Sequence, residues 1–240
     1  MGLVRSANED ALLALPEQNI WGVADGMGGH LRGDWAATCV VEELGHVRLK
    51  HDLEANCDRI ADALEEANTT IFQAGEQTGV TIGSTIVLIH IEGERYACLW
   101  SGDSRAYLLS RQEFRQISRD HSQVEEMIAA GLIKRDEARN HPLGNVITRA
   151  IGVTADMAVD CVTGPLQDND RFVLCSDGLN RCLTDEEIGA IVAERQPQAA
   201  CDWLIEQCLM RGAPDNVSVA VVACEQTTVA LGLAREQVGN

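Results

Sequence analysis

Positive charge is scarce in this chain of 240 residues, and the scarcity narrows the partners that it can bind. Lysine and arginine together number 19, against 37 aspartates and glutamates, so the formal net charge is -18. DNA, RNA and anionic membrane surfaces are bound by clustered lysines and arginines. The composition therefore argues against nucleic-acid binding, and a phosphorylated substrate would need bound cations to offset the acidic excess.

Long apolar runs and a signal-peptide pattern are also missing. No stretch is long enough to cross a bilayer, so we expect no membrane insertion. The nine cysteines are odd in number and form no Cys-x-x-Cys pair, which favours reduced thiols and a cytoplasmic location. With 45% hydrophobic residues and no low-complexity block, residues 1–240 are expected to form a single domain.

Several well-known catalytic patterns are absent as well. The six histidines show neither a His-Glu-x-x-His motif nor a Cys/His zinc spacing. There is no Gly-x-Ser-x-Gly elbow, no Walker phosphate loop and no EF-hand loop. These absences argue against the corresponding zinc, serine-hydrolase, nucleotide and calcium sites.

What the chain does have is an aspartate that follows an apolar run and precedes several glycines. Ile20 to Ala24 has the character of a buried strand, and Asp25 comes next. Glycines after Asp25 leave room for unusual backbone angles and for close approach to an ion. An isolated Asp-Gly is usually only a turn. Similar carboxylates recur elsewhere, however, and together they indicate a shared metal cluster: Glu9-Asp10, Ser176-Asp177-Gly178 and Asp215-Asn216.

The hydrophobic patterns predict an α+β fold with strands grouped apart from helices. Strands are expected at 11–15, 20–24, 81–91, 95–101, 105–110, 113–117, 156–163, 171–175 and 216–224. Helices are expected from Gly33 with Asp34 as N-cap, after Asp58, over 121–132, after a capping box of Thr184 and Glu187, and around 204–209. Residues 134–152 read as an exposed flap. We infer a sandwich of sheets with helices on its outer faces, in which the first hairpin brings Glu9 and Asp10 toward Asp25.

Carboxylates gathered in this way suit magnesium or manganese, which take oxygen ligands. Two such ions about 3.5 to 4 Å apart can bridge a water, lower its pKa and present hydroxide to phosphorus. Asp25 is our choice for the bridging ligand. Asp10 would orient metal-bound water, and the planar fork of Arg5 suits two phosphate oxygens. The remaining ligands would be Glu9, Asp177, Asp215 and the Gly26 carbonyl.

Taken in order, these motifs resemble those of the bacterial PPM (PP2C-type) metal-dependent serine/threonine phosphatases. The resemblance covers essentially the whole chain. It is carried by Arg5-x-x-Asn8-Glu9-Asp10, Ala24-Asp25-Gly26-Met27-Gly28-Gly29-His30, Gly102-Asp103-Ser104-Arg105-Ala106-Tyr107, Ser118-Arg119-Asp120-His121-Ser122, Ser176-Asp177-Gly178 and Asp215-Asn216-Val217-Ser218.

The resemblance implies a four-layer αββα sandwich of two antiparallel sheets flanked by helices. It implies two Mn²⁺ or Mg²⁺ ions on the ligands named above, a weaker third ion at Asp120, and a substrate-handling flap near 121–152. It further implies hydrolysis of phosphoserine and phosphothreonine in proteins, a eukaryotic-type serine/threonine kinase as counterpart, and a monomer. Asp103 and Arg105 are interpreted as structural, forming a turn and an ion pair.

One position departs from the better-known eukaryotic pattern. Met27 stands where those relatives have a histidine that is proposed as general acid, and methionine cannot donate a proton. His30, a metal-bound water, or direct departure of the alkoxide remain open. Two other functions also remain open, namely a silent pseudophosphatase that binds phosphoproteins and a hydrolase of a small phosphorylated metabolite.

Overall fold

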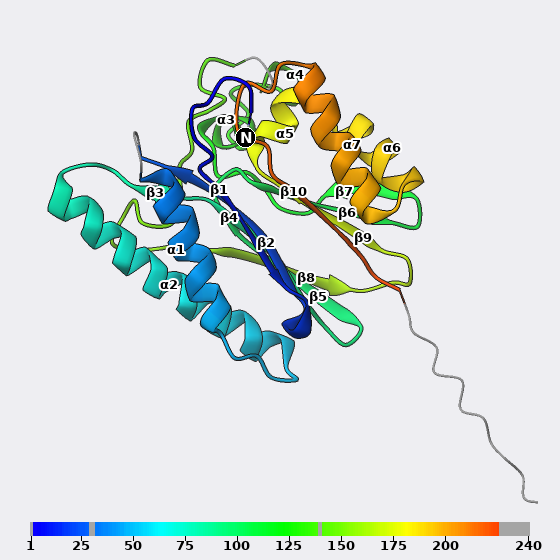
Figure 1. The fold of residues 1–240 in the computed structure, drawn as a ribbon, viewed down its shortest axis with the longest axis horizontal. Helices are drawn as coiled ribbons and strands as arrows, with labels where there is room; N and C mark the ends of the chain where they lie inside the picture. The colour runs from blue at the N-terminus through cyan, green and yellow to red at the C-terminus, as the bar shows by residue number, and fades with distance from the viewer. Residues whose placement is uncertain (1, 29–31, 139–140, 226–240) are drawn as a thin grey trace, which may run out of the picture.

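The computed structural model describes residues 2–28, 32–138 and 141–225. Two sheets pack face to face, and helices cover the outer side of each sheet (Figure 1). Every strand pair in the described part of the chain is antiparallel. The predicted four-layer α+β sandwich is therefore confirmed.

The first sheet carries the aspartate-glycine motif on its second strand. Its main order is β1-β2-β4-β5-β8, and the short β3 pairs with the end of β2. Two long helices, α1 (Gly33–His46) and α2 (Leu53–Thr78), cover its outer face. The strands are β1 (Asp10–Leu15), β2 (Ile20–Met27), β3 (Gly83–Ser84), β4 (Ile86–Glu92), β5 (Arg95–Ser101) and β8 (Asp160–Pro165).

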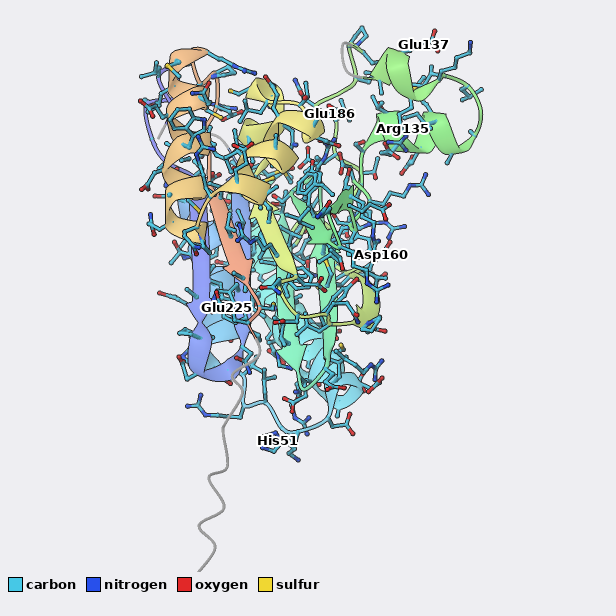
Figure 2. All side chains as sticks on the ribbon, turned by 90° about the vertical axis from the view of Figure 1, so that its right-hand side faces the viewer. His51, Arg135, Glu137, Asp160, Glu186 and Glu225 are labelled. Carbon is cyan, nitrogen blue, oxygen red and sulfur yellow. The ribbon has the colours of Figure 1, made fainter. Side chains whose placement is uncertain are left out.

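The second sheet has the order β10-β9-β6-β7. Its strands are β6 (Arg105–Ser110), β7 (Glu113–Gln116), β9 (Arg171–Cys175) and β10 (Val219–Ala223), and its outer helices are α5 (Asp177–Cys182), α6 (Asp185–Glu194) and α7 (Pro197–Met210). Between β7 and β8 lie α3 (Gln123–Ala129) and α4 (Arg135–Ala138). Figure 2 shows this segment, marked by Arg135 and Glu137, standing out from the body of the molecule where the flap was predicted.

Three apolar clusters hold the layers together, as burial of one face of each element requires. Val87, Trp100 and Phe172 belong to the cluster between the sheets. The cluster under α1 and α2 includes Ile60, Leu64, Ala67 and Ile71, which recur at helical spacing along α2. Tyr107, Leu179, Ile188 and Leu204 belong to the cluster under α5 to α7.

Several predicted boundaries were wrong, and each has a local cause. The second helix begins six residues before the predicted start after Asp58, because Asp52 caps it by accepting a hydrogen bond from the Ala55 N–H at 2.8 Å. Asp34 is not the N-cap of α1, which already begins at Gly33. The predicted strand over 81–91 is divided at Thr85 into β3 and β4.

Among the described residues, no helix combines the length and apolar character needed to span a membrane.

Candidate active site

Strand pairing places Asp10 and Asp25 side by side. β1 begins where β2 approaches its end, and the register pairs Asp10 with Asp25. β2 runs two residues beyond Asp25, so this aspartate lies inside the strand rather than after it. Thr85 fixes the Asp25 backbone, because its hydroxyl accepts a hydrogen bond from the Asp25 N–H at 3.1 Å and its N–H donates to the Asp25 carbonyl at 2.8 Å.

Close packing explains the glycines around Asp25. A Cβ on Gly26 would overlap the carbonyl of Gly33, and a Cβ on Gly33 would lie 2.5 Å from the Glu9 Oε1. The Gly26 N–H also donates to the Glu9 carbonyl at 3.0 Å. At Gly26 and Gly33 the reason for glycine is therefore space. The predicted freedom of backbone angle applies to Gly28, whose φ is +146°.

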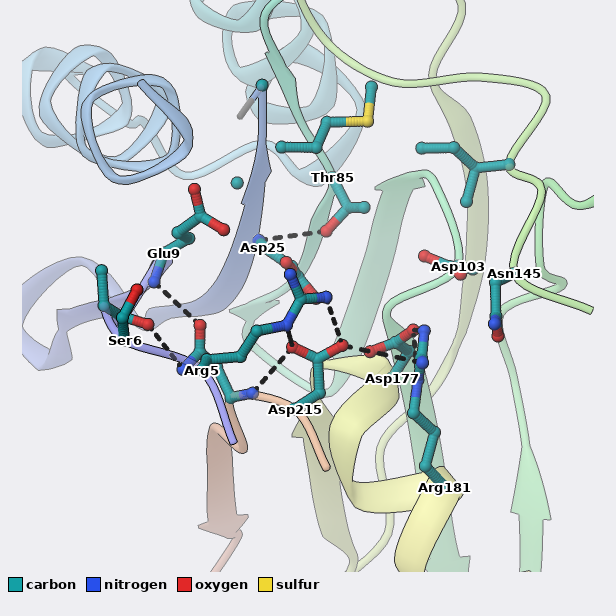
Figure 3. Close-up of a pocket in the computed structure, with 16 residues that line it drawn as sticks. Arg5, Ser6, Glu9, Asp25, Thr85, Asp103, Asn145, Asp177, Arg181 and Asp215 are labelled. Carbon is teal, nitrogen blue, oxygen red and sulfur yellow. Dashed lines mark hydrogen bonds and ion pairs between the residues drawn. The ribbon is translucent and has the colours of Figure 1, made fainter. Parts of the chain in front are cut away.

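Two arginines cross-link the remaining acidic residues. Arg5 Nε lies 2.8 Å from Asp215 Oδ1, and Arg5 Nη2 donates to Asp215 Oδ2 at 2.9 Å. Arg181 donates from Nε to Asp177 Oδ2 at 3.0 Å, one turn along α5, and its Nη1 lies 3.7 Å from Asp215 Oδ2. Figure 3 shows the resulting chain of ion pairs, Arg5 to Asp215 to Arg181 to Asp177, crossing the pocket.

All of these groups line one cavity of about 780 Å³ at an end of the sandwich. The structure thus brings together the predicted Arg5, Glu9, Asp25, Gly26, Asp177 and Asp215, although they come from four separate segments of the sequence. Its acidic lining residues are Glu9, Asp25, Asp103, Asp177 and Asp215.

Burial, and then the charges of neighbouring carboxylates, raise the pKa values of several aspartates in and beside this pocket. Burial, and then the charges of Asp10, Asp177 and Asp103, raise the pKa of Asp25 well above its ordinary value. Burial also raises the pKa of Asp10 and Asp177, although Arg181 works against the shift at Asp177. The pKa of Asp103 rises to about 7, chiefly through burial and then through the charge of Asp177. The pocket is therefore short of positive charge despite its two arginines.

This charge deficit fits divalent cations with oxygen ligands. Asp10 Oδ1 is buried and has no hydrogen-bond partner within the described residues, which leaves an acceptor that an ion's water shell would satisfy. Over residues 2–28, 32–138 and 141–225, no three acidic, histidine or cysteine side chains stand ready to hold one ion. Asp177 and Asp215 point at arginines instead, so metal binding by these two residues would require their side chains to turn.

Two predicted residues lie outside the lining of the main cavity. Asp10 accepts from the Ser176 Oγ at 2.9 Å and sits behind the pocket, next to Asp25. Asp120 is held by Arg105, whose Nη2 donates to Oδ2 at 2.7 Å, and by the Gln116 amide at 2.8 Å. Arg105 is thus structural as expected, but its partner is Asp120 rather than Asp103. A third-ion role for Asp120 stays a prediction.

Sequence reasoning missed two residues of the pocket. Asp103 was read as structural, yet it lines the cavity opposite Asp215 (Figure 3). Arg181 was not singled out, although its spacing of four residues from Asp177 is a recognisable helical ion pair. His30, the one side chain considered as a proton donor, lies outside the described residues. Met27, which cannot donate a proton, does line the cavity.

Comparison with known proteins agrees with this site. The sequence profile of the family described as Protein phosphatase 2C matches residues 2–217. Serine/threonine phosphatase stp of Listeria monocytogenes serotype 4b (strain F2365) is 32% identical over 236 residues, a match that covers 94% of each chain.

Solved structures are similar over nearly the whole chain. One is PppA, described as a key regulatory component of T6SS in Pseudomonas aeruginosa, with a TM-score of 0.85 and 38% identity over 93% of this chain and 94% of that one. Another is the catalytic domain of the serine/threonine protein phosphatase PstP in complex with two manganese ions, with a TM-score of 0.81 and 33% identity over 92% and 93% of the two chains. The acidic pocket, the four-layer fold and these matches together show that the chain belongs to the protein phosphatase 2C family.

Proposed function

We propose that this protein hydrolyses phosphoserine and phosphothreonine in other proteins, using two Mn²⁺ or Mg²⁺ ions. The observation that carries the proposal is the meeting of five acidic side chains in one cavity with Arg5 at its side. Such a cavity repels a phosphate dianion unless cations are bound, and the family membership supplies the expectation of a metal pair. When bound, the ions would lower the pKa of a water molecule and so provide a nucleophile at neutral pH.

The residues around the ions have separate tasks. Glu9, Asp25, Asp177, Asp215 and the Gly26 carbonyl would hold the pair, with Asp25 shared. Arg5 is half-exposed, with 50% of its side chain accessible, and its fork is free to turn from Asp215 to two phosphate oxygens once cations neutralise that carboxylate. Asp10 would accept a hydrogen bond from water next to Asp25.

For a third, weaker ion, Asp103 is a second candidate beside Asp120. Asp103 and Asp177 interact electrostatically and line the same cavity. Asp120 lines an adjoining cavity together with them, but three donor contacts from Arg105 already occupy its carboxylate. An ion at Asp103 would relieve the repulsion between Asp103 and Asp177. An ion at Asp120 would first have to break the pair with Arg105.

A second cavity favours a protein substrate over a small metabolite. It has a volume of about 790 Å³ and shares Asp103, Asn145, Asp177 and Arg181 with the first. The flap residues Arg135 and His141 form one of its walls, and residues of α5 and α6 form another. This space would accommodate the residues next to a phosphoserine. A eukaryotic-type serine/threonine kinase in the cytoplasm would supply such substrates, and we expect the phosphatase to act as a monomer.

The test is phosphate release from a phosphothreonine peptide. Activity should require Mn²⁺ or Mg²⁺ and disappear with EDTA. Asp25→Asn should lower turnover roughly 100-fold or more, because the two ions lose their shared ligand. Asp62→Asn, an exposed aspartate on α2, should leave turnover unchanged.

Two outcomes would separate the remaining alternatives. A protein that binds Mn²⁺ and phosphopeptides without turnover on any of them would be a pseudophosphatase, a function that no observation here favours. Turnover of small phosphoesters with none on phosphopeptides would instead identify a metabolite hydrolase.

A further inference from the structure

Two cysteines that are far apart in the sequence meet at the edge of the first sheet. Cys57 lies in the first turns of α2 and Cys161 lies on β8, the last strand in the order of that sheet. Their Sγ atoms are 4.0 Å apart across a sequence separation of 104 residues.

The strand register explains why Cys161 faces α2. Cys161 pairs with Leu99, which belongs to the apolar cluster under α1 and α2. The next residue, Val162, pairs with Cys98 and packs against the cluster between the sheets. Because side chains alternate along a strand, Cys161 must point to the helical layer. Its contact with Cys57 is therefore fixed by the fold.

Solvent can reach this pair, unlike most of the other cysteines. Cys161 is exposed and Cys57 is partly exposed, whereas Cys39, Cys98, Cys175, Cys182 and Cys208 are buried. Cys182 and Cys208 also interact, but both lie in the cluster under α5 to α7. Cys182 and Cys208 therefore serve as a control within the same protein, because these two thiols lie near each other but are buried from solvent.

The two thiols differ in reactivity. The Cys161 thiol donates to the Cys57 sulfur at 4.0 Å. Once Cys161 is ionised, Cys57 would donate in its place, so this contact lowers the pKa of Cys161 and raises the pKa of Cys57. An exposed thiol with a lowered pKa is the one that reacts with oxidants, and a neighbouring thiol can then resolve the product.

We propose that Cys57 and Cys161 form an oxidisable dithiol site, which hydrogen peroxide converts into a disulfide joining α2 to β8. The Cys161 thiolate attacks the peroxide oxygen, breaks the O–O bond and becomes a sulfenic acid, while the departing oxygen takes a proton and leaves as water. The Cys57 sulfur then attacks the Cys161 sulfur, loses its proton and expels the hydroxyl group as a second water. In sum, two thiols and one hydrogen peroxide give one disulfide and two waters.

The disulfide would act as a covalent link beside the base of the flap. Asp160, next to Cys161, lies 3.0 Å from Arg149 Nη1 and 3.3 Å from His121 Nε2, and Figure 2 shows it on the same face as the flap. A link between sites so far apart in sequence removes much of the freedom of the unfolded chain. We therefore expect oxidation to raise Tm by roughly 5 °C or more.

The test compares reduced full-length protein with protein treated briefly with hydrogen peroxide. After free thiols are blocked, a non-reducing digest should contain a peptide with Cys57 bonded to Cys161 as the main oxidation product. Dithiothreitol should reverse both the link and the rise in Tm. Cys57→Ser should abolish the link and leave oxygen added to Cys161, while Cys201→Ser, a partly exposed thiol on α7, should behave as the parent protein.

The result on the unaltered protein is decisive without any variant. Oxygen accumulating on Cys161 while Cys57 stays free would overturn the proposal. So would a Cys182–Cys208 link that forms first, or a Cys57–Cys161 link that leaves Tm unchanged.

Discussion

Arg181 brings a positive charge into the pocket beside two of the proposed metal ligands. It contacts both Asp177 and Asp215, and it therefore holds a positive charge where metal ligands are proposed. A fixed cation within a few ångströms repels a divalent ion and also competes for the same oxygens.

Arg181→Gln should therefore tighten Mn²⁺ binding in the absence of substrate, by roughly fivefold to tenfold. Isothermal titration with Mn²⁺ measures this directly. The KM for a phosphopeptide should rise in the same variant if Arg181 contacts phosphate after the ions enter. Weaker Mn²⁺ binding in the variant would contradict this view of Arg181.

The different surroundings of Asp103 and Asp120 allow the roles of the two residues to be tested separately. Asp120→Asn should lower stability by about 1 to 3 kcal/mol, because Arg105 loses the nearer of its two charged partners in a site where only 10% of the Asp120 side chain is exposed. Its Mn²⁺ stoichiometry should stay the same. Asp103→Asn should instead reduce binding of any ion beyond the first pair, with little loss of stability. Thermal melts and Mn²⁺ titrations of both variants measure these effects. Loss of the additional ion in Asp120→Asn but not in Asp103→Asn would show that Asp120 binds the third ion.

Among the elements, α1 acts on the site through its first residue. Gly33→Ala would push a methyl group to 2.5 Å from the Glu9 Oε1, so the Glu9 carboxylate must move. We expect turnover or Mn²⁺ affinity to fall by roughly tenfold or more, as for other changes that displace a ligand.

Gly45 provides a control on the same helix. A Cβ there meets nothing within 4 Å, so Gly45→Ala should leave turnover unchanged and stabilise the protein by roughly 0.5 to 1 kcal/mol. Equal effects of the two substitutions on turnover would mean that Gly33 acts only through helix stability.

Elements with strong local signals were predictable from sequence. The Thr184 capping box is present, and β9 has the predicted bounds. Helix α5 was not predicted, because six residues are too few to show a helical period and its first residue, Asp177, reads equally well as a strand end. The break at Thr85 could not be predicted either, since it depends on contacts with Asp25 on β2 and with Ser104, the residue before β6.

In the site, too, features with a local sequence signal were predictable, and features that depend on contacts between distant segments were not. Acidic residues beside apolar runs could be selected from sequence, and strand pairing then brought them together. The partner of each charge could not be predicted, because Arg105 pairs with Asp120 rather than Asp103 only through the placement of β6 beside the loop after β7.

For the whole molecule, the acidic pocket should make stability depend on pH and metal. Folding raises the pKa of Asp103 to about 7, and burial raises those of Asp10, Asp25 and Asp177. A carboxyl group whose pKa is higher in the folded protein than in the unfolded chain favours folding while it is protonated. Its contribution to stability is complete below the unfolded-state pKa and is lost as pH rises through the folded-state pKa. With EDTA present, Tm should therefore fall between about pH 5 and about pH 8.

Asp103→Asn should show a smaller fall over the same range, because it removes one of these acids. Adding Mn²⁺ near pH 8 should recover Tm in the parent protein. Differential scanning fluorimetry at several pH values, with EDTA and with Mn²⁺, measures both effects. A fall that is identical in the parent and in Asp103→Asn would rule out Asp103 as a contributor.

The pocket combines residues from the beginning and the end of the described sequence, so it can form only late in protein synthesis. Arg5 and Glu9 are translated early, whereas Asp215, which pairs with Arg5, and Asn216, whose Oδ1 accepts from the Glu9 N–H at 3.0 Å, are among the last described residues. A nascent chain still lacking residue 215 can assemble the first sheet but has no complete pocket. Phosphatase activity should thus begin only after residue 215 has been added to the chain and has emerged from the ribosome.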